Sequence, residues 1–197
     1  MTSIPMKLSS IVLASVFAAV SPTAQAQMPE SPAVLVAKQR DAMAQFSYLE
    51  GVWRGTAWTL DATGKRLEMT QTERIGPFLE GTVRMIEGRG YMADGSLGFH
   101  ALGVLSHDLA KKTWSLRSWG QGRGGEFPFT PTTDGYVWTT PAGPNATIRY
   151  TAVFKGDTWR EIAEYVAEGR AARQIFEMNL MRVSATTWPE DGAVLLK

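Results

Sequence analysis

The sequence predicts an all-β protein, with about ten antiparallel strands in an up-and-down β-barrel and a short N-terminal helix. Short β-type runs fill the chain from residue 52 to 183, separated by turn signals such as Gly76-Pro77 and Ala93-Asp94-Gly95-Ser96. The runs leave no room for crossover helices, which argues against a parallel sheet. Several runs alternate apolar with polar residues, so the sheet has one buried face, and closure into a barrel removes both exposed edges. Two packed sheets are the alternative.

Residues 1–26 have the features of a secretory signal peptide. Lys7 is the only charge before an apolar run from Leu8 to Val20, and Ala24-Gln25-Ala26 has the small-x-small form of a cleavage site. The alternative, a membrane anchor, needs roughly 20 apolar residues, and this run is shorter. We therefore expect a periplasmic or secreted protein with no membrane span after cleavage.

Composition excludes several classes of site and partner. The chain has no cysteine, which excludes a lipoprotein, disulfides and thiolate metal sites. One of the 20 Lys and Arg residues, and none of the 19 acidic residues, lies in the signal segment, so the mature chain has no net charge. This balance indicates no nucleic-acid or anionic-membrane partner. The composition leaves the oligomeric state open.

A linker and a short helix are expected over residues 27–45. Ser31 can cap the helix and Pro32 suits its first turn. The apolar residues of this segment and its end include Val34, Leu35, Ala42, Met43 and Phe46. Because the segment leads directly into the first strand, we expect it to plug one end of the barrel; the alternative is an extended arm.

The barrel is expected over residues 46–183, with a C-terminal tail over 184–197. Its strands are predicted near residues 52–60, 67–75, 78–89, 98–106, 113–120, 125–130, 135–140, 146–155, 158–167 and 172–183. In the eighth and tenth runs the even-numbered residues are apolar, which identifies the buried face. In the third run Leu79, Val83 and Met85 are expected on the buried face, opposite Glu80, Thr82 and Arg84.

The first strand carries a short aromatic motif. Gly51 allows a sharp turn into the strand, after which Trp53, Gly55 and Ala57 share one face. The pattern Gly51-x-Trp53-x-Gly55 resembles the first-strand signature of the calycin superfamily, and is most similar to that of small bacterial lipocalin-like and nitrobindin-like barrels. In such barrels an arginine near the last strand stacks on this tryptophan. The resemblance therefore implies that Arg182 lies on Trp53, where a cation–π contact stabilises the pair; the alternative is a solvated arginine.

Ten strands enclose more space than side chains fill, so a cavity is expected. In residues 67–75 the odd-numbered face places Gln71 and Glu73 among apolar residues. A carboxylate in an apolar cavity is costly without a partner. Glu73 is therefore a ligand anchor, an acid with a raised pKa or, after a β-bulge, a residue at the wet rim. The other predicted lining residues are Met85, Trp114, Tyr150, Phe176 and Met178.

The function expected from these features is binding of a small apolar or amphipathic molecule inside the barrel. No cofactor is expected: nitrobindin-like proteins hold haem through a histidine near the C-terminal end of the barrel, and here none lies beyond His107. His100 and His107 are predicted on opposite faces of one strand, so they form no metal pair. The alternatives are an isomerase or hydrolase using Glu73 with Tyr150 as acid and base, or a structural or interaction module without a ligand.

Export predicts a mature protein that begins at Gln27, because the apolar run and the Ala24-Gln25-Ala26 site direct cleavage there. N-terminal sequencing of protein recovered from the periplasm or medium checks this. Recovery of a chain that still begins with Met1 would contradict it.

Overall fold

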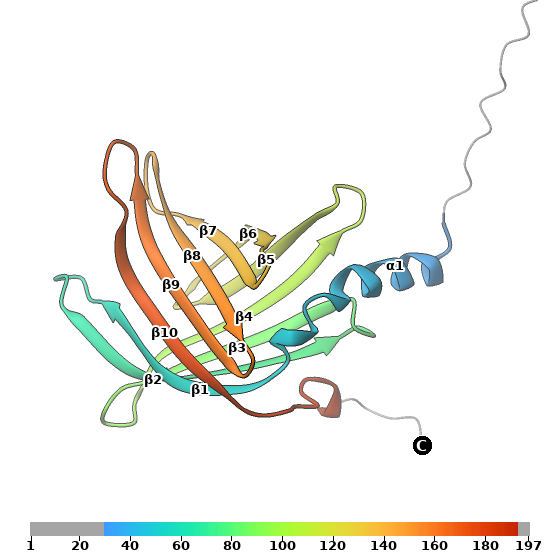
Figure 1. Cartoon of the computed structure of the whole chain (residues 1–197), viewed down its shortest axis with the longest axis horizontal. Helices are drawn as coiled ribbons and strands as arrows, with labels where there is room; N and C mark the ends of the chain where they lie inside the picture. The colour runs from blue at the N-terminus through green and yellow to red at the C-terminus, as the bar shows by residue number, and fades with distance from the viewer. Residues whose placement is uncertain (1–29, 193–197) are drawn as a thin grey trace, which may run out of the picture. The chain divides into compact units, whose positions relative to one another are not determined.

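The computed structural model describes residues 30–192, and the predicted signal peptide and cleavage site lie outside these residues. Ten antiparallel strands close into a barrel in which each strand pairs with the next, and β1 pairs with β10 (Figure 1). The predicted fold class is confirmed. The alternative of two packed sheets is excluded, because the ladder of strand pairs is continuous around the ring.

The helix α1 (Pro32–Ala44) and the 3-10 turn η1 (Ser47–Leu49) precede the barrel, and a second 3-10 turn, η2 (Glu190–Gly192), follows it. The strands are β1 (Gly51–Leu60), β2 (Arg66–Phe78), β3 (Val83–Tyr91), β4 (Leu97–Asp108), β5 (Thr113–Gly120), β6 (Arg123–Pro131), β7 (Gly135–Pro141), β8 (Ala146–Lys155), β9 (Thr158–Ala167) and β10 (Arg173–Ser184). Within residues 30–192, no helix is long and apolar enough to cross a membrane.

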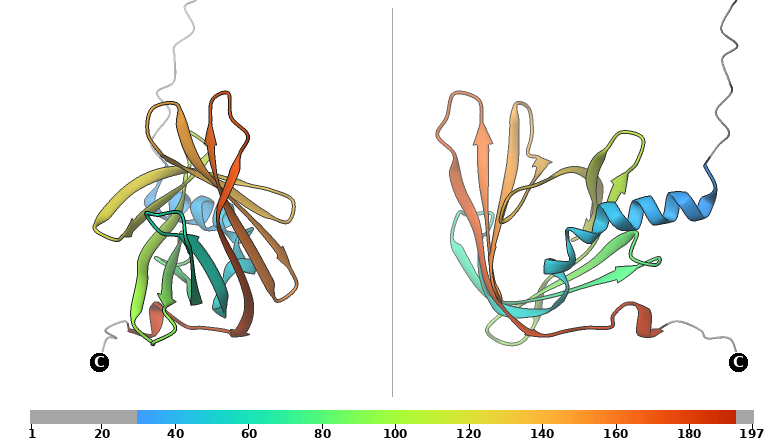
Figure 2. Two further views of the ribbon diagram at one scale, coloured as in Figure 1. Left: turned by 90° about the vertical axis from the view of Figure 1, so that its left-hand side faces the viewer. Right: turned by 45° about the vertical axis from the view of Figure 1, so that its right-hand side comes forward.

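The segment between α1 and β1 closes one end of the barrel. Ser31 caps α1 by accepting a hydrogen bond from the Val34 amide, with a proline in the first turn. Farther along, Met43 and Phe46 are 0 % exposed and Leu49 is 1 % exposed. In the right-hand view of Figure 2, the end of α1 and the turn after it, drawn in blue, lie between strands at this end, while the first part of the helix extends away from the barrel. The segment is a plug rather than an extended arm.

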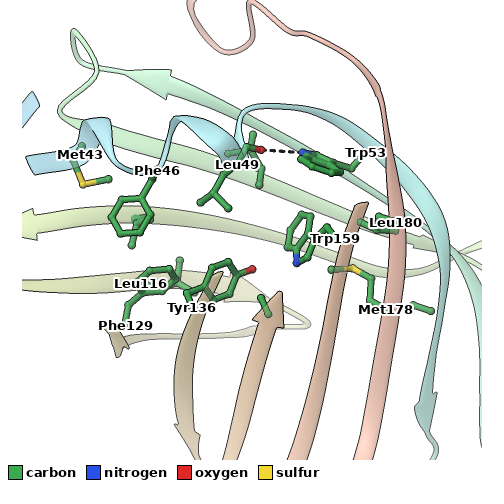
Figure 3. Close-up of a cluster of buried hydrophobic side chains, with 14 residues drawn as sticks. Met43, Phe46, Leu49, Trp53, Leu116, Phe129, Tyr136, Trp159, Met178 and Leu180 are labelled. Carbon is green, nitrogen blue, oxygen red and sulfur yellow. Dashed lines mark hydrogen bonds between the residues drawn. The ribbon is translucent and has the colours of Figure 1, made fainter. Parts of the chain in front are cut away.

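Aromatic packing anchors the plug to the strands. The Phe46 ring lies edge-on to Trp114 on β5 and to Phe129 on β6, with ring centroids 6.1 and 5.6 Å apart. Such edge-to-face pairs add to the free energy gained from burying the rings themselves. Figure 3 shows Phe46 and Leu49 entering the same cluster as Leu116, Tyr136 and Trp159.

Trp53 and Arg182 join the plug to the two strands that close the barrel. Trp53 is fully buried, and its indole N–H donates to the Leu49 carbonyl at 2.9 Å (Figure 3). The Arg182 guanidinium lies over the Trp53 ring at 4.1 Å from its centroid. The same guanidinium donates to the carbonyls of Glu50 and Tyr48, the latter at 2.7 Å. One cation therefore satisfies carbonyls of the plug while it covers the tryptophan of β1.

The turn between β2 and β3 lies later in the chain than the sequence indicates. The predicted turn signal Gly76-Pro77 falls inside β2, which continues to Phe78. The chain reverses over residues 79–82, where Leu79 and Glu80 adopt left-handed backbone with φ of 50° and 57°. Non-glycine residues adopt this region infrequently, so Leu79 and Glu80 do not mark the turn by residue type, and Gly81, with φ of 80°, is its one glycine signal.

The late turn also reverses the predicted faces at the start of β3. Leu79 is 61 % exposed, whereas Arg84 is 5 % exposed and faces inward. The buried charge is paired, because Arg84 Nε lies 2.8 Å from a carboxylate oxygen of Glu50. Residues of the same parity, such as Ile86, line the interior. Met85 therefore lies on the outer face, which corrects the predicted assignment for this strand.

The tail after β10 lies against the outside of β2. The guanidinium of Arg74 lies over the Trp188 ring at 4.4 Å from its centroid. A Cβ atom at Gly76 would come within 1.7 Å of the Trp188 carbonyl oxygen, so the tail approaches the bare backbone of β2 at this glycine. The described part of the predicted tail is thus docked on the barrel wall.

Replacing Arg182 with alanine should lower the free energy of unfolding by about 1–3 kcal/mol, since it removes a desolvated cation–π contact and leaves plug carbonyls without donors. Chemical denaturation monitored by tryptophan fluorescence measures this. The matched control is Arg117→Ala, which breaks an exposed pair with Glu126 at 2.8 Å and should cost less than about 1 kcal/mol. Equal losses in the two variants would show that Arg182 is only a surface charge.

Candidate functional site

The barrel encloses a cavity of about 1040 Å³ that is lined by all ten strands. Leu49 of the plug forms part of its floor. At the other end it is lined by exposed residues of the β5–β6 hairpin, including Gln121 and Arg123, so that end meets solvent. Most of the wall is apolar or aromatic. These apolar and aromatic lining residues include Leu67, Met69, Ile75, Ile86, Phe99, Leu116, Phe127, Phe129, Trp138, Ile148, Ile175 and Phe176.

The structure brings together five of the seven residues predicted to line the interior: Gln71, Glu73, Tyr150, Phe176 and Met178. The other two lie elsewhere. Met85 is on the outer face of β3, as described above. Trp114 shares the inward parity of Leu116, but it lies beneath the plug against Phe46 and does not line the cavity.

Glu73 is buried inside the barrel rather than at a wet rim. Its residue is 8 % exposed, and β2 pairs with β1 and β3 without a register shift, so no bulge rotates it outward. The side-chain amide of Gln71 donates to a Glu73 carboxyl oxygen at 2.6 Å. On the neighbouring strand, a Cβ at Gly88 would lie 2.5 Å from that oxygen, so only glycine leaves room for the carboxyl group.

Burial raises the pKa of Glu73 from its ordinary value of 4.5 to about 8. The hydrogen bond from Gln71 acts in the opposite direction, and the nearby charges of Glu161 and Glu87 raise the pKa further. Glu73 is consequently a protonated, neutral acid at pH 7.

A second buried carboxyl group, Glu161, lines the same cavity. It is 6 % exposed and accepts hydrogen bonds from the Tyr136 hydroxyl at 2.7 Å and from the Trp138 indole at 3.2 Å. Burial raises its pKa, and these donors lower it. The Trp159 indole N–H is directed toward this carboxyl group but does not reach hydrogen-bonding geometry, so the buried N–H has no partner.

Glu161 is not among the residues predicted from the sequence to line the cavity, although the alternation of residues on its strand indicates that it faces inward. On β9 the odd-numbered positions hold Trp159, Glu161 and Ala163, and the even-numbered positions hold Arg160 and Glu164. A strand with a tryptophan and an alanine on one face buries that face, which places its single carboxyl group inside.

An aromatic wall stands beside the two acids. Trp138 and Tyr150 are stacked, with ring centroids 3.9 Å apart and an angle of 12° between their planes. Phe176 meets Tyr150 edge-on at 6.4 Å. Burial raises the pKa of Tyr150 to about 12, so its hydroxyl stays protonated and can donate a hydrogen bond into the cavity.

Neither histidine belongs to this site. His100 lies outside the barrel, 3.1 Å from a carboxylate oxygen of Glu87. His107 packs on Trp114 near the plug, with ring centroids 4.7 Å apart. Because neither side chain lines the cavity, these residues do not fit a haem held through histidine. Residues 30–192 also contain no cluster of three or more histidine or acidic groups placed to hold a metal ion.

Comparison with solved structures supports the fold alone. The crystal structure of Rv2717c from M. tuberculosis aligns with this chain at a TM-score of 0.54 and 14 % sequence identity, covering 72 % of this chain and 96 % of that one. No protein-family model matches the sequence. No curated protein matches it either.

The raised pKa values predict a stability that falls with pH. The folded protein keeps a proton on Glu73 up to about pH 8, whereas the unfolded chain releases it near 4.5. The free energy of unfolding should therefore fall between these values, by at most about 1.4 kcal/mol per pH unit for one proton, and then level off. The raised pKa of Glu161 also makes the free energy of unfolding fall as the pH rises.

Urea denaturation at a series of pH values measures how the free energy of unfolding changes with pH. Glu73→Gln should reduce this slope by up to about 1.4 kcal/mol per pH unit, which is the contribution of one proton. The control is Glu68→Gln, which removes an exposed carboxylate from the outer face of the same strand. A slope unaffected by Glu73→Gln would show that Glu73 is already ionised in the folded protein.

Proposed function

We propose that this protein is an exported, lipocalin-like binding protein that holds a small, largely apolar molecule in its barrel cavity. The observation that carries the proposal is the cavity itself. Its volume of about 1040 Å³ is at the upper end of the roughly 300–1,000 Å³ of small-molecule sites, and a few polar groups interrupt an apolar and aromatic wall as in such sites.

Burial of apolar ligand surface supplies the driving force. Each Å² removed from water contributes about 25 cal/mol, before the cost of association. Access is through the end opposite the plug, where turns rather than packed side chains surround the opening. A barrel interior with this much space argues against a purely structural module, which would be stabilised by packing its core solid.

An isomerase or hydrolase is the second candidate, favoured by one observation: the pKa of Glu73 near 8 suits a general acid or base at neutral pH. Tyr150, its expected partner, lines the same cavity as a hydroxyl donor. Mass spectrometry of a molecule that copurifies with the protein separates the candidates, because a binding protein returns it unchanged after incubation and an enzyme converts it.

The proposal predicts that wild-type protein binds the neutral fluorescent probe N-phenyl-1-naphthylamine saturably and that Thr59→Trp weakens binding at least tenfold. Thr59 lines the cavity on β1, so an indole there occupies ligand space. Thr56→Trp is the matched control, since Thr56 is exposed on the outer face of the same strand.

Fluorescence titration of both variants measures the effect. Unchanged binding in Thr59→Trp would place the probe on the outside of the barrel, and no saturable binding to wild type would refute the proposed function.

A further inference from the structure

The two buried acids lack a cationic partner. Glu73 and Glu161 receive hydrogen bonds from neutral groups: an amide, a phenol and an indole. Buried carboxylates in proteins are otherwise paired with cations or metals. Among the described residues that line the cavity, Arg123 is the sole basic one, and it is exposed at the open end. The deeper part of the cavity thus holds acids without bases.

An unused acceptor lies beside them. Gln71 is 2 % exposed and lines the cavity, and its side-chain oxygen has no hydrogen-bond donor among residues 30–192. The facing residue on β3 is Gly90, where a Cβ atom would lie 3.0 Å from this oxygen. Gly88 provides the same clearance at Glu73. The two glycines make room on β3 for the Glu73 carboxyl group and, beside Gly90, for the Met69 sulfur and the Gln71 oxygen, and these three side chains line the cavity.

From these positions we propose that the ligand is an amphipathic amine, with its ammonium group held by Glu73, Glu161 and the Gln71 oxygen, and its apolar part directed toward the open end. This inference rests on the proposed function. A primary ammonium carries three N–H donors and one positive charge, which matches an acceptor-rich, anion-capable pocket.

The walls suit both parts of such a molecule. The stacked Trp138 and Tyr150 rings line the cavity next to Glu161, and aromatic faces attract cations through their quadrupoles. Toward the open end the lining includes aliphatic and thioether side chains. Residues of that kind there are Leu67, Met69, Met92 and Ile148.

Proton linkage follows from the surroundings of Glu73. The titratable groups near it are Glu161 on β9, Tyr136 on β7 and Glu87 on β3, all of them acids. An arriving ammonium is the charge that stabilises the ionised form of Glu73, so binding releases its proton. Affinity for an amine should therefore rise with pH up to about 8, where Glu73 ionises unaided.

Calorimetric titration with three probes of equal chain length tests the inference: octylamine, octan-1-ol and octanoate. We expect octylamine to bind wild type at least tenfold more tightly than octan-1-ol. Octanoate should bind weakest, because no cation among the described residues of the deep part of the cavity offsets its charge. Octylamine affinity should increase between pH 6 and 8, by up to tenfold per pH unit, while octan-1-ol affinity stays constant.

Two variants locate the effect. Glu73→Gln and Glu161→Gln should each bring octylamine to within about threefold of octan-1-ol, and Glu73→Gln should reduce the pH dependence of octylamine binding. Retained octan-1-ol binding shows that these variants are folded. Glu68→Gln, on the outer face of β2, should behave as wild type.

The possible results distinguish a wrong ligand class from a wrong binding function. Equal affinities for the three probes, or preference for octan-1-ol or octanoate, with all binding weakened by Thr59→Trp, would overturn the amine assignment and leave the binding function intact. Failure of all three probes and of N-phenyl-1-naphthylamine would overturn both.

Discussion

Arg182 occupies the point where the first strand, the last strand and the plug meet. Its guanidinium covers Trp53 and donates to carbonyls at Tyr48 and Glu50, while its own backbone belongs to β10. Closure of a barrel requires its two terminal strands to find each other across the whole chain, at a cost in loop entropy. Here the side chain that links those strands at one end of their ladder also holds the plug, so it couples that end of the β1–β10 pairing to the depth of the cavity.

The plug in turn determines which part of the interior stays empty. Its aromatic and aliphatic side chains fill the end near Trp53, and the cavity begins above Leu49. The two buried acids lie in the empty part, with hydrogen bonds from neighbouring side chains but no compensating charge. A protein normally avoids this arrangement because it costs stability. Buried acids without a compensating charge, and other arrangements that lower stability, are concentrated at functional sites, where a bound molecule offsets the lost stability.

The sequence predicts most of the ring, because alternation with a period of two reports the buried face wherever a strand is regular. Residues 147–154 and 176–182 are of this kind, and through them Tyr150, Phe176 and Met178 were placed on the inner wall. Around Leu79 the alternation misassigns the faces, because the first two left-handed residues of the turn are not glycine and Gly81 alone signals it. Arg84 was assigned to the outer face for a second reason: in sequence, a buried, paired arginine is indistinguishable from a solvated one. Glu161 escaped notice because its strand neighbours, rather than its own residue type, show that it faces inward.

The position of Leu49 allows the depth of the cavity to vary independently of the strands. This residue forms part of the cavity floor, yet it belongs to a 3-10 turn outside the strand ladders. Its hydrogen bond to Trp53 is made by its backbone carbonyl, which any residue provides. Side-chain size at this position sets the depth of the cavity independently of strand register. An evolving or engineered lineage could thus change the length of the molecule it accommodates by substitution at a single site, with the ring of strands left as it is.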